Sequence, residues 1–302
     1  MKLENAKVLV TGATGFIGSV LTNKLLQTGA DVYATSRNRG DSNNGINWFQ
    51  GDLSDLTFVK TIIQEIRPDY IYHLASHVLG AREFEVVEST FRSNFLSAFN
   101  LLIATHQYPC RRLILAGSFE EYNSHSKTII PSSPYSAAKV AASNYARMFH
   151  KLYGTPVCMA ALYMVYGPGQ IDVTKLLPYV ILKTLKGESP QMSSGVRKID
   201  WIYVDDVVSA LIQMAEAADI DGMTIDIGSG KSISIEDIVK LTMELIDPAV
   251  LPEFGSISDR PMEQERNADV DETFRKINWR AATDIRTGLQ KTIDYYAKYS
   301  SK

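Results

Sequence analysis

Features that mark several protein classes are scarce in this 302-residue sequence. Its two cysteines, Cys110 and Cys158, are too few for a disulfide framework and lack the spacing of a metal site. No apolar run approaches the roughly 20 residues of a membrane-spanning helix, and the first ten residues lack the layout of a signal peptide. With 31 basic and 34 acidic residues, the formal charge of −3 excludes recognition of nucleic acid or an anionic membrane by overall charge. We therefore expect a soluble, cytoplasmic protein.

The first third of the chain alternates short apolar, β-branched runs with longer helical patterns. A composition of 45% hydrophobic and 22% charged residues is typical of a folded domain. Apolar residues at helical spacing stop at Gly29, and a second helix is predicted from Leu56 to Ile66. Strands that alternate with helices predict an α/β fold, a Rossmann-type doubly wound parallel sheet. The predicted strands are Val8–Thr11, Asp31–Thr35, Tyr70–Leu74 and Leu113–Ala116.

A change of rhythm after Gly167-Pro168 predicts a domain boundary. Beyond it the elements are shorter, and prolines interrupt the pattern more often. We expect a dinucleotide-binding domain over residues 1–167 and a smaller domain over 168–302. Thr224–Ile227 has the composition of a buried strand, so a stretch of about 200–230 is expected to return to the first sheet. A final amphipathic helix is predicted from Ile285 to Tyr296.

A glycine-rich turn, TGATGFIG at residues 11–18, joins the first predicted strand to the first helix. Glycine permits a tight turn and close approach of a ligand to the backbone, and the following helix N-terminus presents N–H groups to a pyrophosphate. The spacing is G-x-x-G-x-x-G rather than G-x-G-x-x-G. In this strand–turn–helix context it predicts a dinucleotide site formed by Gly12, Thr14, Gly15, Phe16, Ile17 and Gly18.

The residues after the second predicted strand bear on the choice of cofactor. NAD sites usually carry Asp or Glu there for the ribose 2′-hydroxyl, whereas Arg suits the 2′-phosphate of NADP. This chain has Arg37 and Arg39, with no acid before Asp41. The pattern favours NADP(H) over NAD, with a solvated loop as the alternative role of the arginines. Asp52, after a probable third strand, is placed either to accept from the adenine amino group or to cap a helix.

Ser118, Tyr135 and Lys139 form the candidate catalytic group. Tyr135 and Lys139 are four residues apart near the start of a helix predicted from Ser133 to about Leu152, so they share one face. An ammonium beside a phenol is expected to lower the pKa of Tyr135 and make it a proton donor and acceptor near neutrality. Such a pair taken alone is more often a surface pair. Ser118 follows a predicted strand, at the sheet edge where open parallel sheets bind ligands.

These motifs resemble, in order and over essentially the whole chain, those of extended short-chain dehydrogenase/reductases of the NAD-dependent epimerase/dehydratase type. The resemblance implies that Ser118 and Tyr135 contact a sugar oxygen of a nucleotide sugar, while Lys139 holds the nicotinamide ribose and tunes Tyr135. It also implies a C-terminal region that binds the nucleoside diphosphate. The further motifs that carry it are GDL at 51–53, HLA at 73–75, Asn94, YGP at 166–168 and YVDD at 203–206. Through them it adds Leu53, Leu74, Ala75 and Asn94 to the expected cofactor-binding residues.

The segment after Ser118 bears on the reaction. Glucose-type 4,6-dehydratases of this family place an Asp acid where Phe119 stands, and a phenyl ring cannot deliver a proton. Gly117–Tyr122 and Thr35–Asn38 are more similar to GDP-4-keto-6-deoxymannose reductases. The resemblance favours NADPH-dependent reduction of the 4-keto group of a nucleoside-diphosphate-4-keto-6-deoxyhexose. Glu120 then either positions a sugar hydroxyl or is a loop carboxylate. The alternatives are a 4,6-dehydratase or 4-epimerase with the same site, and a non-catalytic dinucleotide-binding module.

The substrate-binding residues depart from the family pattern. Met164 stands just before the YGP segment, where many relatives carry an Asn that holds the substrate. Contacts to the diphosphate are expected from Arg197 and Arg260, because a guanidinium suits phosphate oxygens, and Lys175 is a further candidate. Each of these cations is alternatively an exposed base.

His73 and His77 lie near a strand end and are expected to be packed or solvated rather than catalytic.

The resemblance implies a homodimer that pairs the helices at about 86–106 and 135–152. The apolar residues there suit intramolecular packing equally well.

Overall fold

A seven-stranded sheet forms the centre of the computed structural model, which describes residues 3–38, 45–78, 81–121, 130–259, 262 and 264–300. The strand order is β3-β2-β1-β4-β5-β6-β9, and every neighbouring pair is parallel. The predicted doubly wound parallel sheet is confirmed. The strands are β1 (Lys7–Thr11), β2 (Asp31–Ser36), β3 (Asn47–Gln50), β4 (Tyr70–His73), β5 (Arg112–Ser118), β6 (Val157–Leu162) and β9 (Thr224–Ile227).

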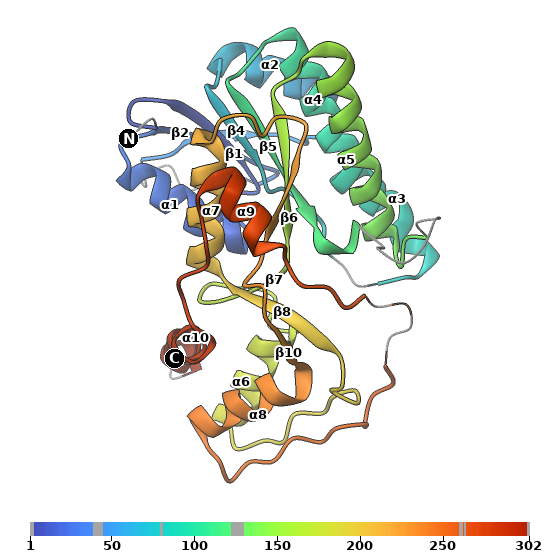
Figure 1. Ribbon diagram of the computed structural model, residues 1–302, viewed down its shortest axis with the longest axis vertical. Coiled ribbons are helices and arrows are strands. Elements are labelled where there is room, and N and C mark those ends of the chain that lie inside the picture. Colours follow the sequence, from blue (N-terminus) through green and yellow to red (C-terminus); the bar gives the residue numbers. More distant parts are fainter. Residues whose placement is uncertain are drawn as a thin grey trace.

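Helices cover both faces of this sheet (Figure 1). Alternate side chains of β1 point to opposite faces, so Val8 and Val10 pack in one apolar cluster while Leu9 packs in another. Both faces of the strand are therefore buried, which explains its continuous apolar sequence. The first cluster takes in α1 (Phe16–Gln27) and α7 (Val204–Glu216), and the second takes in α2 (Leu56–Ile66), α4 (Ser97–Gln107) and α5 (Pro134–Tyr153).

The helical stretch between β4 and β5 differs from the regular helix predicted over about 86–106. A 3₁₀ turn, Phe84–Val86, leads into α3 (Val87–Thr90), and a π-helix over Phe91–Leu96 connects α3 to α4. A π-helix accommodates an extra residue and is frequent at functional sites. Hydrophobic spacing alone does not reveal such a change, because the segment stays helical throughout.

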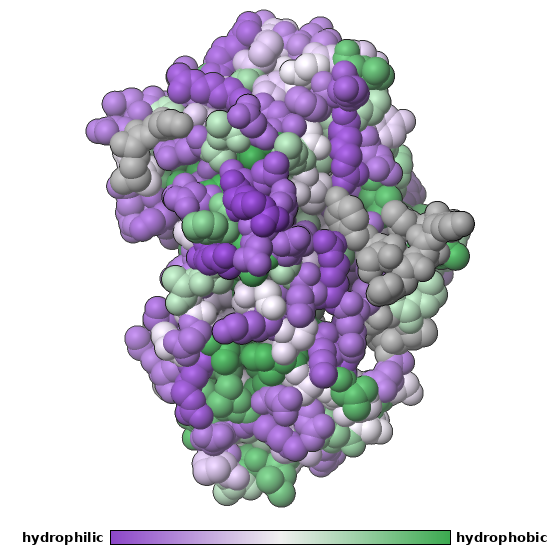
Figure 2. Space-filling model, in the orientation of Figure 1, coloured by the Kyte–Doolittle hydropathy of each residue, from purple (hydrophilic) through white to green (hydrophobic). Residues whose placement is uncertain are grey.

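A second, smaller unit lies below the main sheet in Figure 1. Its three-stranded sheet has the order β10-β8-β7 and packs with helices around Tyr166, Trp201 and Leu289. In Figure 2 the junction of the two parts is visible as an indentation at the left of the molecule. The remaining elements are β7 (Met164–Tyr166), α6 (Leu176–Leu185), β8 (Lys198–Tyr203), β10 (Ser232–Ser234), α8 (Ile235–Ile246), α9 (Val270–Ile277) and α10 (Ile285–Ser300).

The chain passes between the two parts more than once. After β7 and β8 it returns through α7 and β9, and β9 pairs with β6 at the edge of the main sheet. The expectation that Thr224–Ile227 is a strand of the first sheet is therefore confirmed. Within the described residues, no helix combines the length and the apolar character needed to cross a membrane.

Arg112, at the start of β5, connects the main sheet to α7. Its Nε donates to Asp221 at 2.7 Å, and its Nη1 donates to the carbonyls of Met214 and Ala217 at 2.7 and 2.6 Å. Its side chain is only 9% exposed. One buried cation thus satisfies backbone carbonyls at the end of α7.

Replacing Arg112 by alanine is expected to lower the free energy of unfolding by about 3 kcal/mol, because two carbonyls and a carboxylate lose a charged donor. Chemical denaturation followed by circular dichroism measures the change. The matched control is Arg111→Ala, whose side chain is 64% exposed and paired with Asp69. The control is expected to change stability by about 0.5 kcal/mol. Equal losses in the two variants would contradict this role of Arg112.

Candidate active site

The glycine-rich turn lies between β1 and α1 and is formed by direct backbone contact. Gly12 has a positive φ of 73°, and a Cβ there would lie 2.6 Å from the backbone nitrogen of Ala75. A Cβ on Gly18 would lie 2.1 Å from the carbonyl oxygen of Gly12. Both positions therefore exclude any side chain. The turn, the first helix and the end of β4 approach one another as closely as backbones can.

The residues of this turn fit a dinucleotide. Gly15 caps α1 with an extended backbone and, being glycine, provides no side-chain cap for the N–H groups of the first helical turn. Those N–H groups and the positive end of the helix dipole suit a pyrophosphate. Thr14 is exposed, whereas Phe16 and Ile17 are half-buried at the start of α1. The turn thus brings the six predicted residues, 12 and 14–18, to one edge of the sheet.

The end of β4 is fixed to the turn through Thr11 and His73. Thr11 Oγ1 lies 2.8 Å from His73 Nδ1, and it also accepts from the N–H of Ala75 at 3.3 Å. Ser97 Oγ lies 3.2 Å from His73 Nε2. Burial lowers the pKa of His73 to about 3, so the ring is neutral. Both ring nitrogens have hydroxyl partners, which confirms the expectation that His73 is packed.

Asn94, in the π-helix, orders the loop after β4. Its Oδ1 accepts from Ser76 Oγ at 3.0 Å and from the N–H of His77 at 2.6 Å, while its Nδ2 donates to the carbonyl of His77 at 3.1 Å. Asn94 is 1% exposed. Three hydrogen bonds from one buried amide therefore fix residues 76–77 beside the ends of β1 and β4.

Ser118, Tyr135 and Lys139 come together at the carboxyl end of β5. Ser118 is the last residue of that strand, and Tyr135 and Lys139 lie in the first turns of α5, which Ser133 caps by accepting from the N–H of Ser136. Lys139 Nζ lies 5.7 Å from the centre of the Tyr135 ring. The helix that the sequence predicts therefore presents both side chains to one place.

The expectation that the pKa of Tyr135 has a net lowering is wrong for this structure. Burial raises the pKa of Tyr135, and the charge of Glu120 raises it further, while hydrogen bonds with Ser118 and Ser76 act in the opposite direction. The ammonium of Lys139 donates instead to the carbonyl of Ala116 at 2.6 Å. Helical spacing predicts that the two side chains are neighbours, but the pKa depends on burial and on carboxylates from another element. Tyr135 is therefore a protonated phenol at neutral pH.

Phe119 and Glu120 follow Ser118 in a 3₁₀ turn and have different surroundings. Phe119 is 6% exposed, and its ring stacks on Tyr163 with centroids 5.3 Å apart. Glu120 is half-buried, its N–H donates to Ser118 Oγ at 3.3 Å, and its charge acts on Tyr135. The structure thus places a carboxylate, but no second acid from position 119, beside the candidate phenol.

The residues after β2 and β3 lie at the same edge of the sheet. Arg37 is exposed, and its carbonyl accepts from Gln50 at 3.2 Å. Asp52 accepts from the N–H of Ser54 at 2.8 Å. This hydrogen bond is the main cause that lowers the pKa of Asp52, and the charges of Arg92 and Arg37 lower it further.

The helix-capping alternative for Asp52 is excluded, because Asp55 caps α2 by accepting from the N–H groups of Thr57 and Phe58. The carbonyl of the buried Leu53 accepts a hydrogen bond from Asn100 Nδ2 at 2.9 Å. Leu74 donates its N–H to the carbonyl of Thr11 at 3.2 Å. The contacts of Leu74 and Ala75 with Thr11 thus fix residues 74–75 beside the turn, whereas Leu53 is fixed to α4.

The described residues expected to bind substrate lie on or next to three different elements of the smaller unit. Met164 lies half-buried in β7 against the core of the smaller unit. Lys175 begins α6 and donates to the carbonyl of Val78 at 3.3 Å, which links the smaller unit to the loop after β4. Arg197 precedes β8 and donates to the carbonyl of Gln264 at 3.0 Å. Arg260 lies outside the described residues.

Two residues near the candidate phenol were missed by sequence reasoning. Ser76 follows the HLA segment and contacts Tyr135, and Glu121 lies buried next to Lys139. The segment Gly117–Tyr122 contains two adjacent carboxylates, and nothing local in the sequence distinguishes the half-buried Glu120 from the buried Glu121. For Ser76, the one feature of the sequence that could have indicated a site residue is its position after a buried strand, at the ligand-binding edge of the sheet.

The sheet topology and the glycine cradle define a dinucleotide-binding enzyme of the extended short-chain dehydrogenase/reductase type. The chain belongs to the NAD dependent epimerase/dehydratase family, which residues 8–228 match. The resemblance in the motifs is thereby confirmed at the level of the family.

Relatives of this chain span nearly its full length. It is 28% identical to a dTDP-glucose 4,6-dehydratase of Neisseria gonorrhoeae, over 98% of this chain and 97% of that protein. The Bordetella bronchiseptica enzyme WbmF in complex with NADH has a TM-score of 0.84 and 25% identity, covering 99% of this chain and 94% of that one. A UDP-glucose 4-epimerase from Thermotoga maritima has a TM-score of 0.89, 24% identity and coverage of 97% and 99%, which shows the shared fold.

Proposed function

We propose that this protein is an NADPH-dependent reductase that acts on the 4-keto group of a nucleoside-diphosphate-4-keto-6-deoxyhexose. The proposal rests on the family, whose relatives are described as enzymes of dTDP- and UDP-linked sugars, and on the proton-transfer group at the end of β5. The observation that carries the choice of reduction is position 119, where the buried Phe119 stacks on Tyr163 and provides no second acid beside Tyr135.

The protein residues have distinct roles in this proposal. A bound nicotinamide dinucleotide supplies the hydride. Tyr135 gives its proton to the oxygen of the substrate carbonyl, and the hydroxyl of Ser118 donates a hydrogen bond to the same oxygen. Lys139 stabilises the phenolate that remains, because its ammonium lies next to the ring. Glu120 is placed to hold a sugar hydroxyl near Tyr135.

Phe119 argues against the elimination of water by a pair of carboxyl groups. Its ring packs against Tyr163 in the apolar core, so it neither donates a proton nor points to the candidate phenol. A 4,6-dehydratase that protonates the leaving hydroxyl from this position needs an acid there.

A dehydratase or 4-epimerase is the second candidate, and the position of Glu120 favours it. The charge of Glu120 acts on the Tyr135 phenol, so the carboxylate is near the place where a proton next to a 4-keto group is removed. Curated relatives are described as dTDP-glucose 4,6-dehydratases at 25–28% identity. Such enzymes return the hydride to the sugar, whereas a reductase consumes NADPH.

The stoichiometry of cofactor oxidation distinguishes the two. We expect the protein to oxidise NADPH in proportion to 4-keto-6-deoxyhexose nucleotide added, as measured by the loss of reduced-nicotinamide absorbance, with GDP-, dTDP-, CDP- and UDP-linked substrates compared. Conversion of a sugar nucleotide without net oxidation of NADPH would instead establish the dehydratase or epimerase. Binding of cofactor with no conversion of any substrate would indicate a non-catalytic module.

The controls for this assay are two tyrosine variants of the same helix. Tyr135→Phe is expected to lower kcat at least about 100-fold, because the proton donor is lost, while it leaves dinucleotide affinity nearly unchanged. Tyr145→Phe removes a hydroxyl from a ring that is 40% exposed, and is expected to retain activity. Full activity of Tyr135→Phe would remove Tyr135 from the reaction.

We also propose that NADP(H) is the preferred cofactor. The acid-free end of β2 and the exposed Arg37 support this choice, because a guanidinium binds a 2′-phosphate and an acidic residue binds the ribose 2′-hydroxyl of NAD. In this proposal Asp52 accepts from the adenine amino group, and its exposed carboxylate with a lowered pKa supports that role.

Replacing Arg37 by alanine is expected to weaken NADPH binding at least about tenfold and to leave NADH binding nearly unchanged, because only NADPH carries the second phosphate. Fluorescence titration with each cofactor measures the two dissociation constants. Arg111→Ala, at the opposite edge of the sheet, provides the control for loss of one positive charge. Equal effects on both cofactors would contradict the NADP(H) preference.

We propose a domain boundary near residue 167, with a dinucleotide-binding domain before it and a nucleotide-sugar-binding domain after it.

We also propose that the protein is a homodimer. A row of exposed aromatic rings supports this proposal. Phe91 and Tyr145 are 48% and 40% exposed, and Phe95 lies between them with ring centroids 5.3 Å from each. Such a row across the π-helix and α5 suits a symmetric contact with a second copy.

Replacing Phe91 by aspartate is expected to shift the protein from dimer to monomer in sedimentation analysis, because a charge is introduced into the apolar contact. The control is Phe274→Asp on α9, a phenylalanine of similar exposure, 43%, outside the row. A wild-type chain that sediments as a monomer at all concentrations would refute the dimer.

A further inference from the structure

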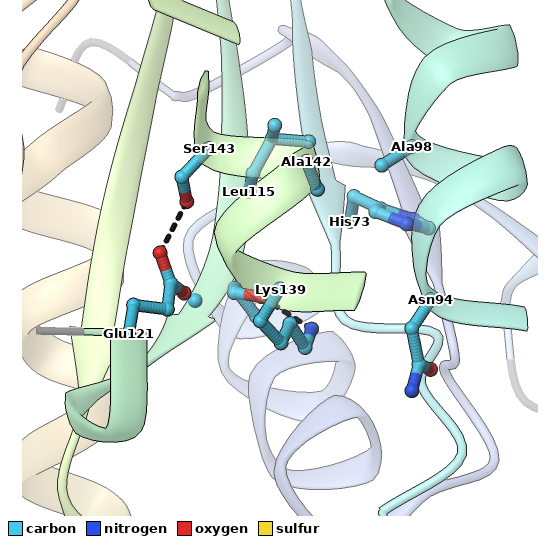
Figure 3. Close-up of a pocket in the computed structure, with 10 residues that line it drawn as sticks. His73, Asn94, Ala98, Leu115, Glu121, Lys139, Ala142 and Ser143 are labelled. Carbon is cyan, nitrogen blue, oxygen red and sulfur yellow. Dashed lines mark hydrogen bonds between the residues drawn. The ribbon is translucent and has the colours of Figure 1, made fainter. Parts of the chain in front are cut away.

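Glu121 is a buried carboxylate immediately behind the candidate catalytic group. It ends the 3₁₀ turn that follows β5 and is 4% exposed. Its Oε1 accepts from the N–H of Ser118 at 2.7 Å, and its Oε2 accepts from the hydroxyl of Ser143 on α5 (Figure 3). A carboxylate inside a protein is destabilising unless its oxygens are hydrogen-bonded. Both oxygens of Glu121 have partners, and one partner is the backbone of Ser118.

The backbone of β5 leaves space for this carboxylate. A Cβ on Gly117 would lie 2.5 Å from Glu121 Oε1. Glycine at 117 therefore permits the carboxylate to lie against the strand directly below Ser118. The Gly-Ser pair at the end of β5 and the glutamate three residues later fit as one unit.

Lys139 is a second buried neighbour of Glu121. Lys139 is 4% exposed, and the two residues line one cavity of about 10 Å³ together with His73, Asn94 and Ser143 (Figure 3). Burial lowers the pKa of Lys139 to about 8, and the charge of Glu121 acts against this lowering. Burial raises the pKa of Glu121, and the charges of Lys139 and Arg147 act against that. Each buried group thus stabilises the ionised form of the other.

The remaining titratable neighbours do not replace Glu121 in this role. His73 from β4 is neutral, with its pKa lowered to about 3 by burial and by Lys139. The negative charge of Glu120 acts on the pKa of Tyr135. Arg147 of α5 is positively charged, as Lys139 is, and its charge acts on the pKa of Glu121. Within the described part of the chain, Glu121 is the carboxylate whose charge supports the ammonium of Lys139.

We propose that Glu121 is a positioning residue of the active site. Its carboxylate fixes Ser118 by accepting from the backbone N–H of Ser118, and its negative charge favours the positively charged form of Lys139. The proposal rests on the proposed function of Ser118 and Lys139. One carboxylate then sets both the place of the hydroxyl that contacts the substrate oxygen and the charge that stabilises the Tyr135 phenolate. In this proposal Glu121 acts through these two residues, and its charge adds to that of Glu120 in raising the pKa of Tyr135.

The test is the pH profile of kcat/KM for NADPH-dependent reduction in Glu121→Gln. The glutamine keeps the shape and an oxygen for the N–H of Ser118, but it removes the charge that holds up the pKa of Lys139. Activity that needs protonated Lys139 is present below the pKa of the lysine and is lost as pH rises through it. The alkaline limb is therefore expected to move to lower pH by about one unit, with activity near pH 6 largely retained.

Three further variants separate this role from a purely structural one. Ser143→Ala removes a hydrogen bond but no charge, and Asp200→Asn removes a buried carboxylate that accepts from Ser229, Gly230 and Ala268 in the smaller unit. Both are expected to lower the melting temperature and leave the limb in place. Glu121→Asp retains the charge and is expected to keep the limb near its wild-type pH. A limb unmoved in Glu121→Gln, or moved equally in Asp200→Asn, would overturn the proposal.

A thermal double-mutant cycle tests the coupling without substrate, so that failure of the proposed reaction does not decide the result. The cycle compares melting temperatures of Glu121→Gln, Lys139→Met and the double variant. Each single variant leaves one buried charge without its partner, so the double variant is expected to lose less than the sum of the two. Additive losses would refute the pairing even if NADPH-dependent reduction is found. Coupling without any reduction would refute the proposed reaction while it supports the pairing.

Discussion

Parallel hydrogen bonding between neighbouring strands is the constraint on which the site depends. β1, β4, β5 and β6 are adjacent and run in the same direction, so their carboxyl ends meet at one edge of the sheet. That edge holds the glycine turn after β1, residues 74–76 after β4 and Ser118 after β5. The glycine-rich turn and the candidate catalytic group are therefore neighbours although more than a hundred residues separate Gly12 from Ser118. α5 completes the group by bringing Tyr135 and Lys139 over the same edge.

Strong local signals account for the part of the fold that the sequence predicts. The helix Leu56–Ile66 begins after its Asp55 cap and ends before Pro68, and its predicted and observed bounds agree. The glycine turn and the helix at 134 are predicted for the same reason, since Gly, Ser-Pro and helical spacing act within a few residues. Strands of three residues, such as β7 and β10, have no periodicity of their own and are determined by tertiary pairing. The π-helix is hidden inside a continuous helical pattern.

The chemistry of the site was predictable in its members but not in their electrostatics. Ser118, Tyr135 and Lys139 follow from motif and spacing, whereas the pKa of each group depends on burial and on distant side chains. Tyr135 illustrates the difference, because the effect of Lys139 was expected to dominate and burial with Glu120 dominates instead. Glu121 illustrates it further. Its burial requires a glycine at 117 and a serine at 143, and no local pattern joins these three positions.

The π-helix at Phe91–Leu96 makes the length of this segment as important as its composition. Asn94 reaches the carbonyl and N–H of His77 from a turn that is wider than an α-helical one. A chain shorter by one residue here would regain α-helical hydrogen bonding, and the helices on either side would keep their facing because the wide turn takes up about one extra residue. The wide turn from which Asn94 reaches His77 would be lost, and with it the hydrogen bonds that order the loop after β4. Insertions and deletions in this segment are therefore constrained even where individual substitutions are tolerated.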